Sequence, residues 1–508
     1  MDPRRTPSIA EWFHEETKYS PRSMGLLPRP DLDSRPTPYK EWHASEPIDL
    51  VPYLPFPGFP LGPSEDQRPL DPALLSEFVG ALSRILYFTG GVTGIQQDSD
   101  ESWLFRAAPS AGALYPTDIT LALRGIRGIE DGLYAYSVPN HQLVSVLEGD
   151  FLPGIASSFW LHPAFDGVQA VVLLSGVWQR SRWRYHDRAY RRILLDTGHV
   201  LGNLVHAAQQ EGLQAVPLAG FEDAALQKLL FLDPAEEGVL VGVPLRRADD
   251  VSTAADGLVA AVKRSSRSKA PPDFESDPIH AIHQSSSIHH DAEVTMPPDP
   301  PVWAEGVEGT RVIPLVETLG DISHEFPGIV VSRRSARQFT GASVDRRDLD
   351  RVLDFAHRYA TPGPIRYLNA RPALQIHLVM NRVRGLEQGV WRYIPDEHQL
   401  QLIRSGDERR RVHGACLGQE LARDAACLLV YSADLPRAVE VWGDRAYRYL
   451  HLDAGFLGQQ LNLACVHQGL GVSGIGGFFD DMWTEILGLP GDHAISYITA
   501  IGDPFAAE

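Results

Sequence analysis

Polar side chains with the chemistry to bind an anion lie together in one short stretch of the C-terminal half, V-S-R-R-S-A-R-Q-F. This stretch places Arg333, Arg334, Ser335 and Arg337 just before a segment of helical periodicity. Alternating guanidinium groups beside a hydroxyl can bind a phosphate through bidentate, charge-assisted hydrogen bonds, with Arg337 free to reach a second electron-rich group. The alternative interpretation is a solvated basic patch, the commoner role of a run of charges.

Two other stretches are built from small residues, which let a flat ring lie against exposed backbone. The first, R-A-A-P-S-A-G-A-L-Y-P, contains Pro109, Ser110, Ala111, Gly112 and Ala113. The second, G-V-S-G-I-G-G-F, contains Gly476 and Gly477. Either stretch is also compatible with an ordinary turn beside a strand. Each motif taken alone is therefore weak.

Composition limits the classes of partner. The chain has 508 residues, enough for two or three domains, and 44% of them are hydrophobic. Its formal net charge of −19 argues against nucleic acid or an anionic membrane as the main partner. The N-terminus has no apolar core, and no apolar run is long enough to span a bilayer. We therefore expect a cytoplasmic protein without a signal peptide or a membrane span.

Cysteine and histidine residues predict neither disulfides nor a metal site. The three cysteines lack paired spacing and are predicted to be small buried hydrophobes in a reducing compartment: Cys416, Cys427 and Cys465. A histidine cluster lies in a polar segment without a second set of ligands: His280, His283, His289 and His290. The same segment echoes the N-terminus, since Ile282-His283-Gln284 resembles Phe13-His14-Glu15.

An internal repeat organises the chain. The segment R-A-Y-R-R-I-L-L-D-T-G from Arg188 returns as R-A-Y-R-Y-L-H-L-D-A-G from Arg445, an offset of 445 − 188 = 257 residues. The same offset pairs Gly220-Phe221 with Gly477-Phe478. The predicted organisation is an extended N-terminal arm (residues 1–64), a first domain (65–247), a linker that wraps the surface (248–324) and a second domain (325–508).

Hydrophobic patterns predict an α+β fold in each copy. Continuous apolar runs of strand length over 168–174 and 425–431 predict central strands. The segments 190–210 and 447–468 are apolar on more than one face, which predicts long helices buried in a domain or subunit interface.

Together, the motifs R-R-S-x-R-x-F, P-S-A-G-A-L-Y-P, R-A-Y-R-x-x-x-L-D-x-G and G-I-G-G-F resemble the nitroreductase superfamily, and in particular its SagB/McbC-type dehydrogenases. The likeness covers both copies. It implies an α+β fold that dimerises through long helices, with FMN held between two copies. In that family the R-R-S-x-R segment and the glycine-rich turn come from one copy, and the P-S-A-G segment comes from the other.

The two halves of such a site survive on different copies of the repeat. The R-R-S-x-R motif is present in the second copy, whereas the corresponding place in the first copy, around Gly62 to Leu70, lacks it. The P-S-A-G motif of the first copy maps onto Arg366 to Ala373, where Arg366 and Tyr367 are bulky. We therefore predict an internal pseudo-dimer with one intact FMN site, an empty opposite site, and further homodimerisation left open.

In the enzymes that the chain resembles, flavin removes a hydride and a proton from an azoline made on a ribosomal peptide. A Lys-Tyr pair just before R-A-Y-R is associated with the proton step. Here Tyr185 is kept and the lysine is replaced by Arg184, which stays protonated and is no base. Positive charge on Arg184 and Arg188 would favour a Tyr185 phenolate. The alternative role for Tyr185 is a packed aromatic whose hydroxyl binds backbone.

The resemblance thus predicts an FMN-dependent oxidoreductase that acts on a peptide-derived or small heterocyclic substrate. Two alternatives stay open at this point. One is an NAD(P)H-dependent, nitroreductase-like reductase. The other is a catalytically degenerate scaffold partner of a biosynthetic complex, which the loss of one half-site and of the lysine would suit.

Overall fold

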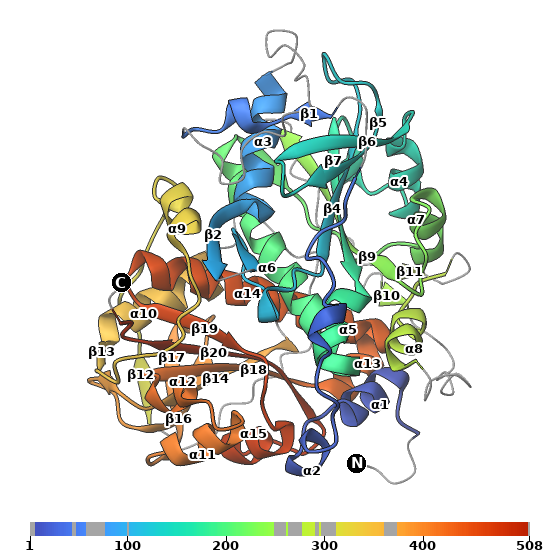
Figure 1. Ribbon diagram of the computed structural model, residues 1–508. Helices are drawn as coiled ribbons and strands as arrows, with labels where there is room; N and C mark the ends of the chain where they lie inside the picture. Colours follow the sequence, from blue (N-terminus) through green and yellow to red (C-terminus); the bar gives the residue numbers. More distant parts are fainter. Residues whose placement is uncertain are drawn as a thin grey trace.

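A computed structural model describes residues 6–42, 47–56, 77–98, 101–247, 261–262, 277–289, 294–295, 311–359 and 373–505. Two domains, each with a seven-stranded sheet, meet along a pair of long helices (Figure 1). The fold is α+β, as the sequence predicts. The repeat is therefore a repeat of whole domains.

The two sheets have the same topology. In the first domain the spatial order is β1 (Ile48–Asp49), β6 (Gln142–Glu148), β5 (Gly132–Ser137), β4 (Thr117–Leu123), β7 (Ala170–Val177), β9 (Glu237–Arg247) and β8 (Leu213–Ala215). In the second it is β12 (Val312–Pro314), β17 (Gln399–Ser405), β16 (Gly389–Ile394), β14 (Gln375–Met380), β18 (Cys427–Asp434), β20 (His493–Gly502) and β19 (Gly471–Ile475). The predicted central runs form β7 and β18, which are buried along nearly their whole length.

The offset of 257 residues also holds for strand register. Leu121 of β4 pairs with Tyr134 of β5, and Leu378 of β14 pairs with Trp391 of β16. The register shift that follows Leu133 in the first domain recurs at its counterpart in the second. Because such bulges bend a strand, their recurrence shows that the two sheets are curved in the same way.

Two long helices form the centre of the molecule. They are α6 (Ala189–Gln210) and α14 (Ala446–His467), which pack against each other between the domains. A Cβ atom at Gly198 of α6 would lie 2.3 Å from the carbonyl oxygen of Leu452, and one at Gly455 of α14 would lie 2.2 Å from that of Leu195. Glycine at both positions lets the two backbones touch. The predicted internal pseudo-dimer is thus confirmed.

Shorter helices surround this centre. In the first domain they are α3 (Glu77–Gly90), α4 (Leu152–Ser158), α5 (Trp178–Tyr185) and α7 (Asp223–Leu229). In the second they are α9 (Phe326–Ser332), α10 (Arg346–Asp354), α11 (Arg409–Ala415), α12 (Glu420–Asp424), α13 (Leu435–Trp442) and α15 (Asp480–Leu487). Two-stranded ribbons are formed by β2 (Val92–Asp98) with β3 (Glu101–Arg106), β10 (Ala261–Val262) with β11 (Val294–Thr295), and β13 (Val344–Asp345) with β15 (Val383–Arg384).

The N-terminal arm is not extended throughout, because it contains α1 (Ile9–Glu16) and α2 (Pro21–Met24). Ser8 and Glu11 begin α1 with a capping box, in which each side chain accepts the other residue's backbone N–H. The arm also contacts both domains. The N–H of Ala10 donates to Asp444 of the second domain at 2.9 Å, whereas β1 joins the sheet of the first.

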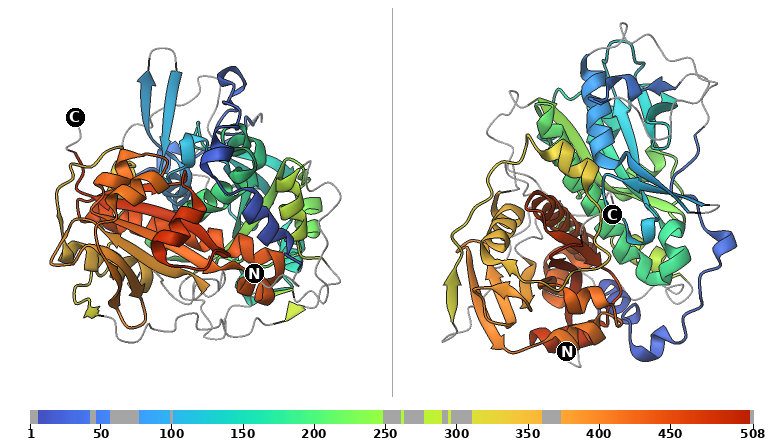
Figure 2. Two further views of the ribbon diagram at one scale, coloured as in Figure 1. Left: turned by 90° about the horizontal axis from the view of Figure 1, so that it is seen from below. Right: turned by 60° about the vertical axis from the view of Figure 1, so that its left-hand side comes forward.

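The linker also contacts both domains, but with the two domains exchanged relative to the arm. Its helix α8 (Pro278–Ser285) packs beside α1, and the following Ile288 bridges Glu222 of the first domain. Its strand β12 joins the sheet of the second domain. Figure 2 shows α1 and α8 lying on the same side of the molecule. The echo between the two segments in the sequence therefore reflects their pseudo-symmetric positions.

Two buried ion clusters join the domains. Asp480 of the second domain accepts hydrogen bonds from Arg188 at 2.6 Å and from Arg191 at 2.7 Å. Arg188 is the N-cap residue of α6, and Arg191 lies in its first turn. The exposed fraction of Asp480 is 1%. The spacing of R-A-Y-R thus positions two guanidinium groups for one carboxylate across the domain boundary.

The second ion cluster is the pseudo-symmetric copy. Asp223 accepts hydrogen bonds from Arg445 and Arg448, both at 2.6 Å. Arg448 also donates to the carbonyl of His283 in α8, as Arg191 does to the carbonyl of His14 in α1. The arm and the linker are therefore bonded to the same guanidinium groups that join the domains.

Among the described residues, no helix is long and apolar enough to cross a membrane. The same part of the chain holds no group of three or more metal-ligating side chains, although His290 lies outside it. All three cysteines are buried, as predicted, and burial raises the pKa of Cys416 to about 12.

Candidate active site

The loop between β3 and β4 carries the small residues singled out in the sequence. Within it, Gly112 has φ = +65°, a conformation that side-chain-bearing residues rarely adopt. A Cβ atom at this position would lie 2.7 Å from the hydroxyl oxygen of Tyr185 and 3.3 Å from Cδ of Arg184. Glycine is therefore required both by the backbone and by the approach of the predicted catalytic pair.

An aspartate on the central helix α6 holds this loop in place. The hydroxyl of Ser110 donates to Asp196 at 2.5 Å, and the N–H of Ala111 donates to the same carboxyl group at 3.2 Å. Ser110 in turn accepts the N–H of Tyr115 at 2.8 Å. Burial raises the pKa of Asp196 to about 7, against the opposing effect of these hydrogen bonds.

The first two arginines of R-R-S-x-R cross the domain boundary to the same region. Arg333 is 3% exposed and donates to the carbonyls of Ala107 at 3.1 Å and Arg106 at 3.2 Å, at the end of β3. Arg334 donates to the carbonyl of Thr93 in β2 at 3.1 Å. Burial lowers the pKa of Arg333 to about 10. These two guanidinium groups thus fasten the second domain to the β2–β3 ribbon of the first.

The remaining polar residues of the motif face open space. Ser335 and Arg337 line a cavity, and Arg337 is exposed. Within the described part of the chain, Arg337 forms no hydrogen bond and no ion pair. The motif is therefore divided between two structural arginines and a serine and an arginine that are available to a ligand.

Behind Tyr185 lies a second arginine of the central helix, Arg192. Its guanidinium carbon stands 3.8 Å from the centre of the Tyr185 ring, and its exposed fraction is 6%. Its Nε has no hydrogen-bond partner among the described residues. A Cβ atom at Gly476 would collide with this guanidinium group, whereas Gly477 faces Leu417, whose Cδ1 would be 2.9 Å from such an atom. Of the two predicted glycines, Gly476 lies against Arg192, whereas Gly477 lies against Leu417 and Gln419.

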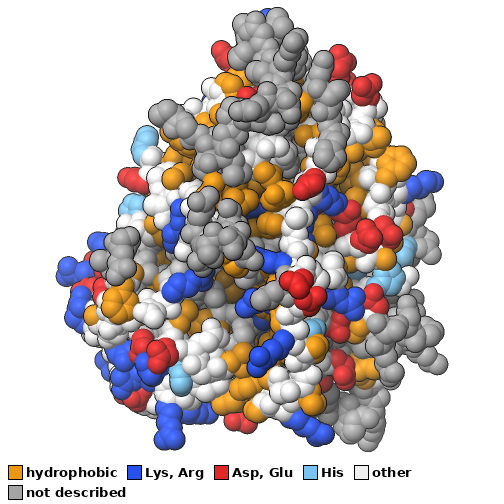
Figure 3. Space-filling view, in the orientation of Figure 1, with side chains coloured by type: hydrophobic (Ala, Val, Ile, Leu, Met, Phe, Trp, Pro, Cys, Tyr) orange, Lys and Arg blue, Asp and Glu red, His pale blue; other side chains and the backbone are white. Residues whose placement is uncertain are grey.

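Part of each predicted half-site lines a single cavity of about 760 Å³, whereas Ala111, Gly476 and Gly477 are not among its lining residues. It is lined by Gln96, Trp103, Phe105, Pro109, Ser110, Gly112, Ala113, Tyr115, Arg184, Arg333, Arg334, Ser335 and Arg337. Four of these are arginines, and the lining within the described residues contains no carboxylate. Figure 3 likewise shows Lys and Arg side chains along the boundary between the domains. The volume is within the range of cofactor and small-molecule sites.

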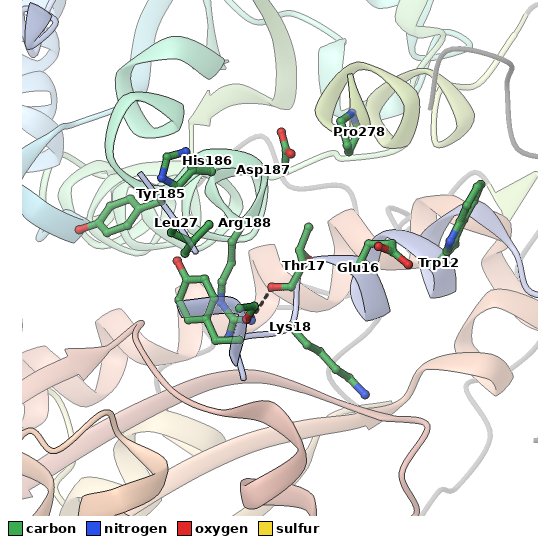
Figure 4. A pocket seen from close by; sticks show the side chains of 12 residues that line it. Trp12, Glu16, Thr17, Lys18, Leu27, Tyr185, His186, Asp187, Arg188 and Pro278 are labelled. Atoms are coloured by element: carbon green, nitrogen blue, oxygen red, sulfur yellow. Dashed lines mark hydrogen bonds between the residues drawn. The ribbon is translucent and has the colours of Figure 1, made fainter. Parts of the chain in front are cut away.

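A smaller cavity of about 400 Å³ lies on the other side of Tyr185, between the arm and the start of α6. Figure 4 shows the Tyr185 hydroxyl pointing away from it, and Arg188 reaching the carbonyl of Thr17, at 2.8 Å. Arg188 is also bound to Asp480, so its charge is already paired. Arg192 contacts the ring of Tyr185, whereas Arg188 stacks on Tyr19 and Phe478, so the predicted effect of Arg188 on Tyr185 stays a prediction.

The pseudo-symmetric position in the second domain holds two aromatic residues. The counterpart of Tyr185 is Trp442, which is 1% exposed, and the counterpart of Arg192 is Tyr449, which is fully buried. The two rings contact each other edge to face at 6.4 Å. The bulky replacements expected at residues 366–373, and the segment 62–70, lie wholly or largely outside the described residues.

Sequence reasoning missed Arg192 and Asp196. Both lie inside the repeated R-A-Y-R-R-I-L-L-D-T-G segment, and Arg192 replaces the tyrosine of the other copy. Arg192 could have been found in the sequence, because it is a position at which the two otherwise similar copies differ. No comparable signal marks Asp196, since the second copy has Asp453 at the same place.

Comparison with known proteins identifies the family. The model of the nitroreductase family matches residues 66–245 and 330–503, and the chain belongs to this family. The crystal structure of a protein from Anabaena variabilis that carries a nitroreductase name superposes with a TM-score of 0.86 at 34% identity. The alignment covers 98% of this chain and all of the other one. The tandem two-domain architecture is thus shared over the full length.

Two curated relatives are similar to this chain over about the length of one domain. A protein of Methanocaldococcus jannaschii that carries a nitroreductase name is 29% identical over 162 residues, which is 31% of this chain and 82% of the relative. The trifolitoxin-processing protein TfxB of Rhizobium leguminosarum bv. trifolii is 28% identical over 152 residues, which is 29% of this chain and 41% of TfxB. The predicted resemblance to the nitroreductase superfamily is therefore confirmed.

Proposed function

We propose that this protein is an FMN-dependent oxidoreductase with one flavin site per chain, placed in the 760 Å³ cavity between its domains. The observation that carries the proposal is the meeting of two complementary half-sites. Residues Pro109 to Ala113 come from the first domain, and Ser335 and Arg337 come from the second. Buried aromatic rings at Trp442 and Tyr449 support a single site, because they replace the polar pair at the opposite position.

The residues of the cavity fit the groups of FMN. Ser335 and the unpaired Arg337 suit its phosphate, for which a hydroxyl and a guanidinium group are typical donors. The small residues Ser110, Gly112 and Ala113 in the cavity wall suit the approach of a flat ring. Arg192 does not line the cavity itself; it lies behind Tyr185, and its buried Nε lacks a partner among the described residues.

When bound, FMN supplies two-electron redox chemistry. The protein's own contribution is to position and to handle a proton. Tyr185 is the candidate for the proton step, because its hydroxyl lies against Gly112 in the cavity wall and its ring is held by Arg192. Arg184 beside it stays protonated and therefore contributes charge only. Asp196 keeps the small-residue loop in position through Ser110 and Ala111.

For the reaction we favour the SagB/McbC type, in which a hydride and a proton leave a peptide-derived or small heterocyclic substrate. The kept Tyr185 and the similarity to a protein named for trifolitoxin processing support this choice. The similarity to nitroreductases supports the second candidate, an NAD(P)H-dependent reductase. Anaerobic addition of NADPH separates the two. Rapid bleaching of the flavin without any substrate identifies the reductase, and its absence favours the dehydrogenase.

The flavin site is tested by cofactor content. We expect purified protein reconstituted with FMN to hold one equivalent per chain, and Arg337→Ala to weaken FMN binding by at least about tenfold, as loss of a charge-assisted phosphate contact predicts. Arg410→Ala is the matched control, because Arg410 is an exposed arginine of α11 that is remote from the cavity lining. Two equivalents per chain, or equal FMN affinity of both variants, contradicts the proposal. Protein that takes up no FMN would favour the scaffold role.

A further inference from the structure

We infer that the substrate carries a carboxylate and that Arg184 binds it; this inference rests on the proposed function. Arg184 lies near the end of α5, is exposed and lines the large cavity. Its side chain runs along Gly112, where Cδ would be 3.3 Å from a Cβ atom. With the described residues it forms neither a hydrogen bond nor an ion pair, so its guanidinium group is available to a ligand.

Arg184 is the arginine of the cavity lining that is neither bound to backbone nor assigned to the flavin, and its guanidinium carbon stands 5.8 Å from the centre of the Tyr185 ring. Arg333 and Arg334 are bound to backbone carbonyls, and Arg337 is assigned to the phosphate of the flavin. On a chain of net charge −19, a cavity lined by arginines and by no described carboxylate selects an anion. Buried Arg192 adds to the same positive field. The exposed guanidinium group of Arg184 can therefore exchange water for a charge-assisted pair with a further anionic group.

The chemistry of Arg184 favours a carboxylate on the substrate. A single guanidinium group binds one carboxylate bidentately and fixes its orientation, and it does not take up a proton from the substrate. Trp103 and Phe105 of the β2–β3 ribbon line the same cavity. Arg35 covers one face of Trp103 at 3.9 Å and Arg334 stands 5.2 Å from the centre of the Phe105 ring, which leaves the opposite faces or the edges to a planar ring. The ribbon stands out from the first domain over this region (Figure 2). The geometry thus suits a flat, unsaturated ring with an attached carboxylate.

Benzoate and its neutral analogue benzamide are suitable probes for the FMN-loaded protein. Their dissociation constants are measured from the perturbation of the flavin absorption spectrum and by titration calorimetry. We expect the wild type to bind benzoate at least about tenfold more tightly than benzamide, as expected for one charge-assisted pair. Arg184→Gln should abolish this preference and keep the FMN content, Arg184→Lys should retain part of it, and Arg410→Gln should leave it unchanged.

Equal binding of benzoate and benzamide by the wild type overturns the inference, and so does an unchanged preference in Arg184→Gln. Arg184→Gln that keeps the preference but bleaches more slowly with NADPH assigns Arg184 to a dinucleotide phosphate, which also overturns it. FMN content is measured on the same samples. Wild type without FMN refutes the proposed function, whereas FMN-loaded wild type without a preference for benzoate refutes only the role of Arg184.

Discussion

The sharpest structural prediction concerns Asp480, the carboxylate that joins the two domains through Arg188 and Arg191. The substitution Asp480→Asn keeps the shape of the side chain and removes its charge. Arg188 is 2% exposed and Arg191 3%, so both guanidinium groups would be left buried without a counter-charge. Removing one partner of a buried ion pair costs about 3–5 kcal/mol of unfolding free energy. For domains of this size, that corresponds to a fall in Tm of roughly 6–20 °C.

Differential scanning calorimetry of the full chain at neutral pH measures this change. The neighbouring Asp481 provides the matched control, since it pairs with Lys18 at 2.9 Å but is 72% exposed. Exposed pairs contribute about 0–1 kcal/mol, so Asp481→Asn should hardly change Tm. Asp223→Asn, in the pseudo-symmetric ion cluster, should reproduce the effect of Asp480→Asn. A Tm of Asp480→Asn close to that of Asp481→Asn would refute the reasoning.

Acid titration gives a second readout of the same contact. Burial alone would raise the pKa of Asp480, but the charges of Arg188 and Arg191 outweigh it and hold the pKa below its usual value. A depressed pKa in the folded state stabilises the protein above the unfolded pKa of about 4, and this contribution is lost as pH falls through the folded pKa. The wild type should therefore lose its advantage over Asp480→Asn on acidification below about pH 4.

Two further predictions concern the helix pair and the loop. Gly455→Ala should destabilise the protein by at least about 1–3 kcal/mol, because a Cβ atom there meets the Leu195 carbonyl at 2.2 Å. Gly328→Ala, which meets nothing within 4 Å, should be neutral or stabilising, and equal thermal shifts would contradict the helix crossing. Asp196 has a pKa raised to about 7 by burial, so wild-type stability should fall as pH rises from about 4 to about 7 and level off above. The fall in unfolding free energy is at most on the order of 4 kcal/mol, and Asp196→Asn should not show it. Tm profiles against pH that run parallel for the wild type and Asp196→Asn would exclude a raised pKa of Asp196.

The internal sequence repeat by itself predicted most of the fold. Strand register, the recurrent bulges and the long helices all follow the offset between Arg188 and Arg445, because two copies that bury the same pattern adopt the same topology. The complementary loss of motifs also predicted that residues of both domains share one site, and the R-R-S-x-R and P-S-A-G segments line one cavity, without the predicted Gly476 and Gly477. These conclusions needed only residue types and spacing.

Only the tertiary structure decided which arginine side chains are free to bind a ligand. Arg333 and Arg188 have the same side chain as Arg337, but their guanidinium groups are taken by the carbonyl of Ala107 and the carboxylate of Asp480, each more than 200 residues away in the chain. Likewise, Arg192 contacts Tyr185 because the first turns of α6 fold back over the end of α5. Motif spacing reports which groups are present. Pairing across a domain boundary depends on packing between distant segments, which spacing does not encode.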